Sequence, residues 1–312
     1  MHIRRRRPFH SLAVVAGLAG ATLIAGVAFG QSTEDVGGQV SADEGTARQP
    51  DSMPSADELF KRHLDAVGGR EKLLEIRAQH VEGTVRQIGG DYFALLSVTN
   101  IANDEAPHRV RVVIEPIGQP TIKTQFDGQF GWTELGESTY DIIVGPRLQN
   151  LARDADYLML PQFEEAFPQR ESTDKVEFEG RGMFRAEVQN RYGMTERHWF
   201  DAETGLLTIT ESAQAVAGGS FRPITVIYRE YRDFGNGIKY PRLIEQITIE
   251  QPEEGDPIQI VMRLTYDSVI TDPERIDPIR MPDELRQEIE RIMERQQRER
   301  ERQQREGAGS GG

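Results

Sequence analysis

The sequence predicts an α+β fold built on one long, curved antiparallel sheet, with a helix at its start and another near its middle. Two observations support this prediction. Between residues 80 and 270, alternating or β-branched segments follow one another, separated by short turns rich in Gly, Asp and Pro. Short turns between successive strands are typical of an antiparallel meander, and only the start and the middle of this region have helical periodicity. We therefore expect a single open sheet with covering helices.

The domain is expected to open with a helix that begins after Ser55. Ser55 can cap this helix, and Glu58 three residues later completes a capping box. Gly68-Gly69 marks its end, and a second short helix is expected over residues 70–76. The apolar face of the first helix contains Leu59, Phe60, His63, Leu64 and Val67.

The strands are interrupted once, by a helical pattern from Pro146 to about Met159. Pro161 and Pro168 bound the loop that follows. Before this helix, strands are expected at residues 80–87, 92–100, 109–115, 121–126, 131–135 and 140–144. After it, they are expected at 175–180, 183–191, 195–201, 206–211, 224–234, 238–250 and 259–270.

Residues 1–30 have the pattern of an export signal. Four arginines, Arg4 to Arg7, precede an apolar run, and Ala28 and Gly30 are small residues at the two positions that a signal peptidase reads. The run is rich in Ala and Gly, so a cleaved signal is favoured over a permanent membrane anchor. We therefore expect a periplasmic or otherwise exported protein with no integral membrane segment after cleavage. The arginine pair before Phe9 leaves both general secretion and twin-arginine export open.

The rest of the chain divides by composition into three further parts. Residues 31–55 are polar and small and are expected to form a disordered linker. Residues 56–281 form the predicted folded domain. Residues 282–312 are dense in Glu, Arg and Gln and are expected to form a charged helix with a flexible tail.

Composition excludes several classes of function. The 312 residues contain no Cys, which rules out disulfides, cysteine-ligated zinc, iron–sulfur clusters, a thiol nucleophile and a lipid-modified Cys. The formal net charge of −14 argues against general nucleic-acid binding.

A search for catalytic motifs gives no candidate for a catalytic residue, a metal site or a cofactor. The chain lacks H-E-x-x-H, G-x-S-x-G, the P-loop and the dinucleotide fingerprint. His63 lies on an apolar helix face, where a packing role is favoured over metal ligation. Carboxylates are abundant, so a carboxylate-dependent hydrolase remains a weaker alternative.

Several short stretches resemble the LolA/LolB-like lipoprotein-carrier superfamily. They are ADELF at 56–60, AVGGRE at 66–71, VEGT at 81–84, FDG at 126–128, WFDAETGLL at 199–207 and YRDF at 231–234. The resemblance implies an open half-barrel whose concave face is covered by helices and forms a cavity for acyl chains or other apolar ligands. The Asp- and Gly-containing stretches are turn motifs, so they indicate the fold more specifically than the function.

If such a cavity exists, large apolar side chains of the strands and of the middle segment are expected to line it. For each of them, ordinary core packing is the alternative. The candidates are Phe126, Trp132, Leu148, Leu151, Leu158, Leu160, Phe163, Phe167 and Trp199.

The resemblance and the export signal together predict a non-enzymatic carrier or sensor. Its partner would be a lipid, a lipoprotein acyl chain or another apolar small molecule. The alternative is an envelope protein-interaction module that uses the sheet as a scaffold and the charged C-terminal helix to dock a partner protein. Neither hypothesis involves nucleic acid or a cofactor.

Overall fold

The computed structural model describes residues 53–103, 107–136, 139–216, 221–250, 255–291, 294–295 and 298. The chain divides into two compact units, one ending at Ile276 and one beginning at Asp277. In the second unit, residues 283–291 are helical. The predicted signal, almost all of the predicted linker and the end of the predicted tail lie outside the described residues. Within the described ranges, no helix is long and apolar enough to cross a membrane.

Most strands of the first unit lie close to their predicted positions, but β7 begins six residues before its predicted start and β10 ends four residues after its predicted end. Six precede the middle helices: β1 (Ala78–Gln87), β2 (Phe93–Ile101), β3 (Arg109–Pro116), β4 (Ile122–Phe126), β5 (Gly131–Leu135) and β6 (Thr139–Ile143). Seven follow them: β7 (Gln169–Phe178), β8 (Arg181–Gln189), β9 (Thr195–Asp201), β10 (Leu207–Ala215), β11 (Phe221–Asp233), β12 (Lys239–Glu250) and β13 (Ile258–Thr271).

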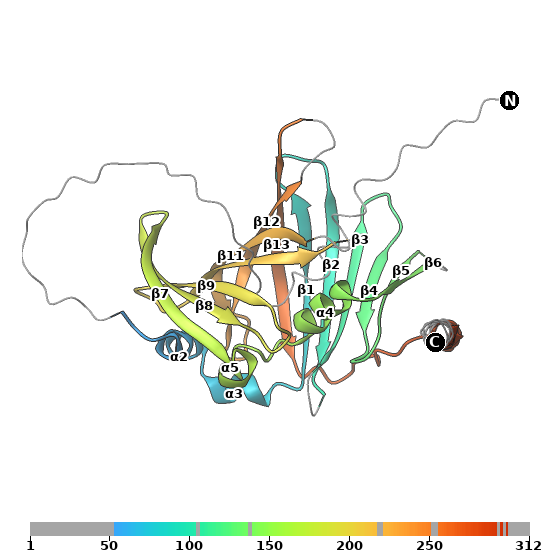
Figure 1. Ribbon diagram of the computed structural model, residues 1–312, viewed down its shortest axis with the longest axis horizontal. Coiled ribbons are helices and arrows are strands. Elements are labelled where there is room, and N and C mark those ends of the chain that lie inside the picture. The colour runs from blue at the N-terminus through green and yellow to red at the C-terminus, as the bar shows by residue number, and fades with distance from the viewer. Residues whose placement is uncertain are drawn as a thin grey trace, which may run out of the picture. The chain divides into compact units, whose positions relative to one another are not determined.

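These strands form one antiparallel sheet in the order β6-β5-β4-β3-β2-β1-β13-β12-β11-β10-β9-β8-β7 (Figure 1). The chain starts in the middle of the sheet at β1 and runs outward to one edge at β6. It then crosses to the other edge at β7 and returns to the middle at β13. Among the described strands, β6 and β7 do not pair with each other, so the sheet is open and not a closed barrel. This confirms the predicted fold class.

The first helix, α2 (Ala56–Val67), has the predicted capping box. The Ser55 backbone N–H donates to the Glu58 carboxylate at 2.7 Å, and the Glu58 N–H donates to the Ser55 hydroxyl at 3.3 Å. The helix ends at Gly68, whose φ of 127° is strained for any residue with a side chain. A Cβ on Gly68 would lie 2.4 Å from the carbonyl oxygen of Gly237, so this turn packs directly on the β11–β12 turn.

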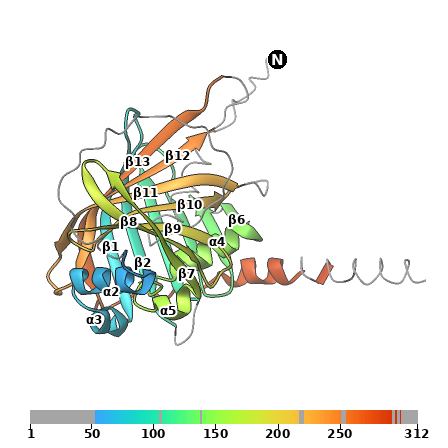
Figure 2. The ribbon, with the colours of Figure 1, turned by 60° about the vertical axis from the view of Figure 1, so that its left-hand side comes forward.

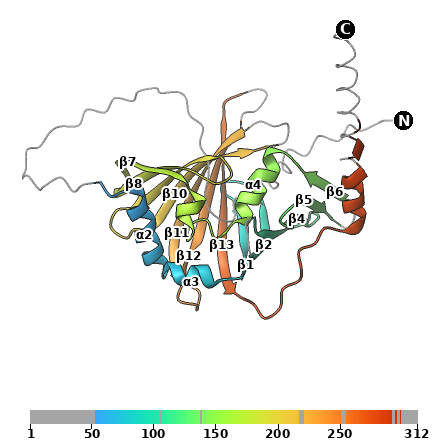
Figure 3. The same cartoon turned by 60° about the horizontal axis from the view of Figure 1, so that its bottom comes forward.

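Three shorter helices accompany α2: α3 (Arg70–Glu75), α4 (Pro146–Ala155) and α5 (Phe163–Ala166). α4 contacts β3, β4 and β10, whereas α2 contacts β7, β8 and β12. Figures 2 and 3 show α4 within the curve of the sheet and α2 and α3 beside its rim. The middle helix ends at Ala155, short of the predicted Met159, because the buried Asp156 caps it and starts a run of turns.

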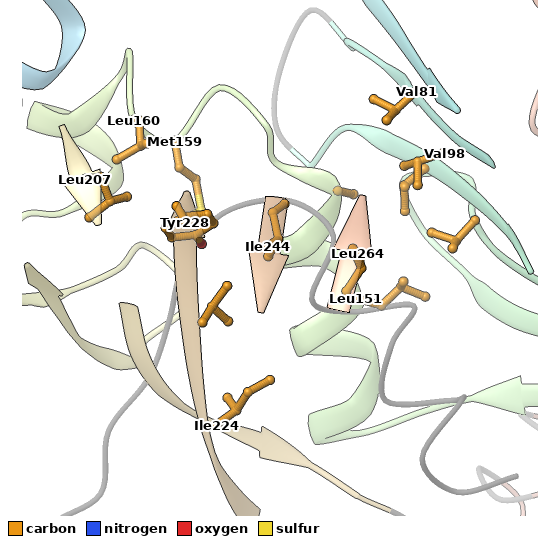
Figure 4. Packing of buried hydrophobic residues seen from close by; sticks show 14 of the residues in the cluster. Val81, Val98, Leu151, Met159, Leu160, Leu207, Ile224, Tyr228, Ile244 and Leu264 are labelled. Carbon is orange, nitrogen blue, oxygen red and sulfur yellow. The ribbon is translucent and has the colours of Figure 1, made fainter. Parts of the chain in front are cut away.

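The hydrophobic core lies between the concave face of the sheet and these helices. Strand alternation directs Val81, Val98, Ile244 and Leu264 into this layer, and Leu151 of α4 packs against them from the helical side (Figure 4). All five side chains are at most 4% exposed. The core therefore depends on both halves of the sheet and on the middle segment.

The β1–β13 ladder contains a register shift between Glu82 and Gly83. At Gly83 the two backbones approach so closely that a Cβ would lie 2.1 Å from the carbonyl oxygen of Thr265. Only glycine fits this position without moving a strand.

We expect Gly83→Ala to destabilise the protein by about 2 kcal/mol, since overpacking against backbone forces the ladder apart. Gly182→Ala in β8 is the matched control, because there the nearest atom, Cε of Lys175, is 3.5 Å from the new Cβ. Neither glycine has a positive φ, so backbone strain does not distinguish them. Urea unfolding of both variants measures the difference, and equal midpoints would contradict the steric argument.

Candidate functional site

An apolar cavity of about 110 Å³ lies between the helices and the concave face of the sheet. Its walls come from α2, α3, the turns after α4, and strands β1 and β10–β13. The lining residues are His63, Leu64, Val67, Leu73, Ile76, Gln79, Val81, Tyr157, Leu158, Leu160, Pro161, Leu207, Tyr228, Tyr231, Lys239, Tyr240, Pro241, Ile244 and Tyr266.

Local sequence patterns explain how these side chains converge. His63, Leu64 and Val67 share one face of α2 because they are spaced at three and four residues. The Gly68-Gly69 turn ends α2, and α3 then presents Leu73 to the same cavity. On β12, alternation places Tyr240 and Ile244 on the same side of the strand.

Two tyrosine hydroxyls of the cavity wall donate hydrogen bonds to backbone carbonyl groups. The Tyr157 hydroxyl donates to the Ile76 carbonyl at 2.9 Å, and the Tyr231 hydroxyl donates to the Leu207 carbonyl at 2.7 Å. The Tyr240 hydroxyl is buried close to the side chains of Asn236 and Gln79. Burial raises the pKa of Tyr240 to about 12, so its phenol is neutral at physiological pH.

His63 joins α2 to the sheet at the edge of the cavity. Its ring is 4% exposed, and its Nδ1 accepts a hydrogen bond from the Leu207 backbone N–H at 3.0 Å. Burial, with a smaller effect from nearby His198, lowers the pKa of His63 to about 3. The ring is therefore neutral, and because Nδ1 is an acceptor its proton lies on Nε2. The packing role expected from the sequence agrees with this position.

Buried charged groups hold the turns that follow α4. Arg153 and Asp154 form a buried ion pair at 2.5 Å. The Asp156 carboxylate accepts a bond from the Tyr192 hydroxyl at 2.9 Å and lies 3.3 Å from the Arg191 guanidinium and 3.5 Å from the His108 ring. Burial raises the pKa values of Asp154 and Asp156, that of Asp154 to about 7. These contacts fix the start of the segment that presents Leu158 and Leu160 to the cavity.

A cluster of aromatic rings lies beside the cavity and holds α2 against α5. The Phe60 ring stacks on Phe163 and on Phe167, with centroid separations of 5.1 and 5.3 Å, and meets Phe200 edge-on at 5.3 Å. His198 completes the cluster, and its Nε2 lies 2.7 Å from the buried Glu196 carboxylate. The four phenylalanine side chains have no exposed surface. They pack against one another and do not line the cavity.

The structure divides the nine residues predicted to line a cavity into two groups. Leu158 and Leu160 line it. The other seven lie elsewhere: Phe163 and Phe167 in the aromatic cluster, Phe126, Trp132 and Leu151 fully buried, Leu148 partly buried against the core, and Trp199 on the strand face opposite Phe200, 6.4 Å from the Phe178 ring. A role in ligand binding stays a prediction for all nine.

Four tyrosines of the cavity wall were not among the residues predicted to line it. Tyr228, Tyr231, Tyr240 and Tyr266 come from β11, β12 and β13. Their strands were correctly predicted, and the alternation of side chains along a strand indicates which residues share one face of the sheet. The part of the sheet that α2 and α3 cover depends on tertiary packing, so the sequence alone did not single these residues out.

Comparison with known proteins gives matches at the level of structure only. No family model and no curated protein sequence matches the chain. A putative outer membrane lipoprotein-sorting protein domain from Vibrio parahaemolyticus is similar with a TM-score of 0.46 and 9% identity, over 71% of this chain and 92% of that one. A LolA superfamily protein from Nitrosomonas europaea has a TM-score of 0.44 and 13% identity, over 74% and 97%.

A third similar structure is a DUF1329 family protein from Desulfovibrio piger, with a TM-score of 0.47 and 11% identity, over 71% of this chain and 95% of that one. Of these three structures, the one from Nitrosomonas europaea is described as a member of the superfamily that the sequence motifs resemble.

We expect His63 to make the protein less stable in acid. The folded-state pKa of about 3 lies below the ordinary value of 6.5, so the unfolded state binds the proton more tightly. The stabilisation is complete above pH 6.5 and declines as the pH falls towards 3. At pH 4.5 this amounts to a loss of about 3 kcal/mol, from about 1.4 kcal/mol per pH unit.

The measurement is the free energy of unfolding of wild type and His63→Asn at pH 7.5 and pH 4.5. Asn offers a side-chain oxygen to the Leu207 N–H but does not titrate. The free-energy difference between wild type and His63→Asn should shrink by about 3 kcal/mol on acidification. A difference that does not depend on pH would contradict the assignment.

Proposed function

We propose that this protein is a non-enzymatic carrier or sensor that binds an acyl chain or a similar apolar ligand in the cavity between α2, α3 and the sheet. The main support for this proposal is the set of residues that line the cavity. They are aliphatic or aromatic apart from His63, Gln79 and Lys239. The predicted export signal at residues 1–30 would place this activity outside the cytoplasm.

The size of the cavity favours a narrow ligand. Its volume of about 110 Å³ is several times the roughly 10–15 Å³ that one water requires, but its apolar walls give water few partners. Such a cavity gains more from a hydrocarbon, because each buried methylene contributes about 0.8 kcal/mol. One extended chain or a single ring matches this space better than a broad polycyclic ligand.

The arrangement of carboxylates favours binding over hydrolysis. No Asp or Glu is among the described residues that line the cavity. The buried acids near α4 are each engaged: Asp154 with Arg153, Asp156 with Tyr192, and Glu196 with Asn190 and His198. These partners give the acids a structural role under α4. The proposal therefore assigns no catalytic residue.

We expect Leu73→Trp to block ligand binding, because the larger side chain would occupy the cavity from α3. Leu74→Trp is the matched control, since Leu74 is a partly buried neighbour on the same helix that does not line the cavity. Binding is measured by the fluorescence of cis-parinaric acid methyl ester, a neutral single-chain probe that suits the narrow cavity. Leu73→Trp should weaken binding about tenfold or more, which is about 1.4 kcal/mol, and Leu74→Trp should leave it near wild type.

Circular dichroism of both variants checks that the fold is retained. The absence of saturable binding to the wild-type protein would refute the proposed function. Equal weakening by the two substitutions would place the binding site elsewhere.

A further inference from the structure

We infer that the ligand of this cavity carries an anionic group, which Lys239 binds at the cavity mouth. This inference rests on the proposed function and narrows it to one class of ligand: a single-chain amphiphile whose chain lies in the cavity and whose carboxylate or phosphate lies at the rim. The inference rests on the charges around the mouth.

Lys239 is the one cationic side chain among the described residues that line the cavity, because His63 is neutral. It is the first residue of β12, it is exposed, and it is followed by the cavity residues Tyr240 and Pro241. Lys239 alternates with Tyr240 along β12, so it borders the cavity from the end of the strand, and its exposed side chain keeps the ammonium group in water. The charge is thus located where the apolar lining meets solvent.

The side chain of Lys239 has no partner within the described part of the chain. No carboxylate of the described residues forms an ion pair with its ammonium group, and this group makes no side-chain hydrogen bond among them, although the backbone of Lys239 pairs with Asp233 in the ladder. Many arginines of this acidic protein, by contrast, pair with carboxylates, as Arg70 does with Glu164 and Arg229 with Glu179. An unpaired cation beside an apolar cavity is available to a ligand.

A second lysine borders the same mouth. A Cβ on Gly237 would lie 3.1 Å from the Nζ of Lys72, so the ammonium group of this α3 residue lies over the β11–β12 turn, two residues before Lys239. The chain contains only five lysines, at positions 61, 72, 123, 175 and 239. Two of the five are therefore gathered at one turn beside the cavity.

Two carboxylates reduce this positive charge in part. Asp272 accepts hydrogen bonds from the backbone N–H groups of Arg77 and Ala78, and its charge acts on the cavity residues Tyr157 and Tyr240. Asp233 accepts hydrogen bonds from the backbone N–H groups of Gly235, Asn236 and Gly237. These bonds, with a smaller contribution from Lys72, lower the pKa of Asp233, so it is ionised. Asp233 thus partly neutralises Lys72, and because it lies opposite Lys239 in the β11–β12 ladder it also reduces the positive charge there, without forming an ion pair with Lys239. Lys239 is the group that we assign to the ligand.

The test compares an anionic probe with a neutral probe of the same chain. cis-Parinaric acid and its methyl ester are titrated into the full-length protein at pH 8 and low ionic strength. We expect the acid to bind about threefold to tenfold more tightly than the ester, the range of one or two exposed ion pairs. Salt at 0.5 M should reduce this preference by screening, without weakening the ester.

The variant Lys239→Gln should remove the preference by weakening the acid alone. Lys61→Gln is the matched control, because Lys61 is an exposed lysine of α2 that does not line the cavity. A parallel pair with the same acyl chain, lysophosphatidylglycerol and the phosphate-free monoacylglycerol, is tested by displacement of the neutral parinaric ester. Tighter binding of the parinaric acid than of its ester identifies a carboxylate as the anionic group, and tighter binding of lysophosphatidylglycerol than of monoacylglycerol identifies a phosphate.

Either preference supports the inference if Lys239→Gln removes it and Lys61→Gln does not. Equal binding of the charged and neutral members of both pairs would overturn the inference and leave the proposed function intact. A preference that survives Lys239→Gln would also overturn it. If no probe binds at all, the proposed function fails and the inference fails with it.

Discussion

The order of the strands forces one segment to carry the chain across the concave face of the sheet. The chain leaves the sheet at β6, on one edge, and re-enters at β7, on the other. Residues 144–168 must span the distance between them, and they do so over an apolar surface. The segment therefore contributes Leu151, Met159 and Leu160 to the core, and the stretch from 157 to 161 becomes a wall of the cavity.

A crossing of this kind buries irregular backbone and needs specific contacts to hold its path. The ion pair of Arg153 with Asp154 and the contacts of Asp156 with Arg191 and Tyr192 provide them at the end of α4. Buried ion pairs contribute little net stability because desolvation offsets their attraction, but breaking one leaves a charge without compensation. We therefore interpret these groups as selecting one path for the segment. The position of the cavity wall follows from that path.

Much of the fold could be predicted from local sequence. Alternating strands with Gly and Asp turns located every strand of the sheet, and Ser55 with Glu58 located the start of α2. The end of the middle helix was wrong because it depends on Asp156, whose partners lie far along the chain. The residues that line the cavity were harder to predict than the strands. Phe163 is as suited to a cavity wall as Leu158 or Leu160, but it stacks on Phe60, and only tertiary packing determines this contact.

The pairing of β1 with β13 also affects the order in which the sheet folds. Among the described strands, every other pair joins neighbours in the sequence, so each half of the sheet is a stack of local hairpins. Val81 and Val269, by contrast, meet only after most of the domain has been brought into a loop. Because the entropy of closing such a loop must be overcome before its contacts form, this seam is expected to close late in folding. Until it closes, each half exposes an unpaired central strand, which makes the seam the natural place for two chains to exchange halves.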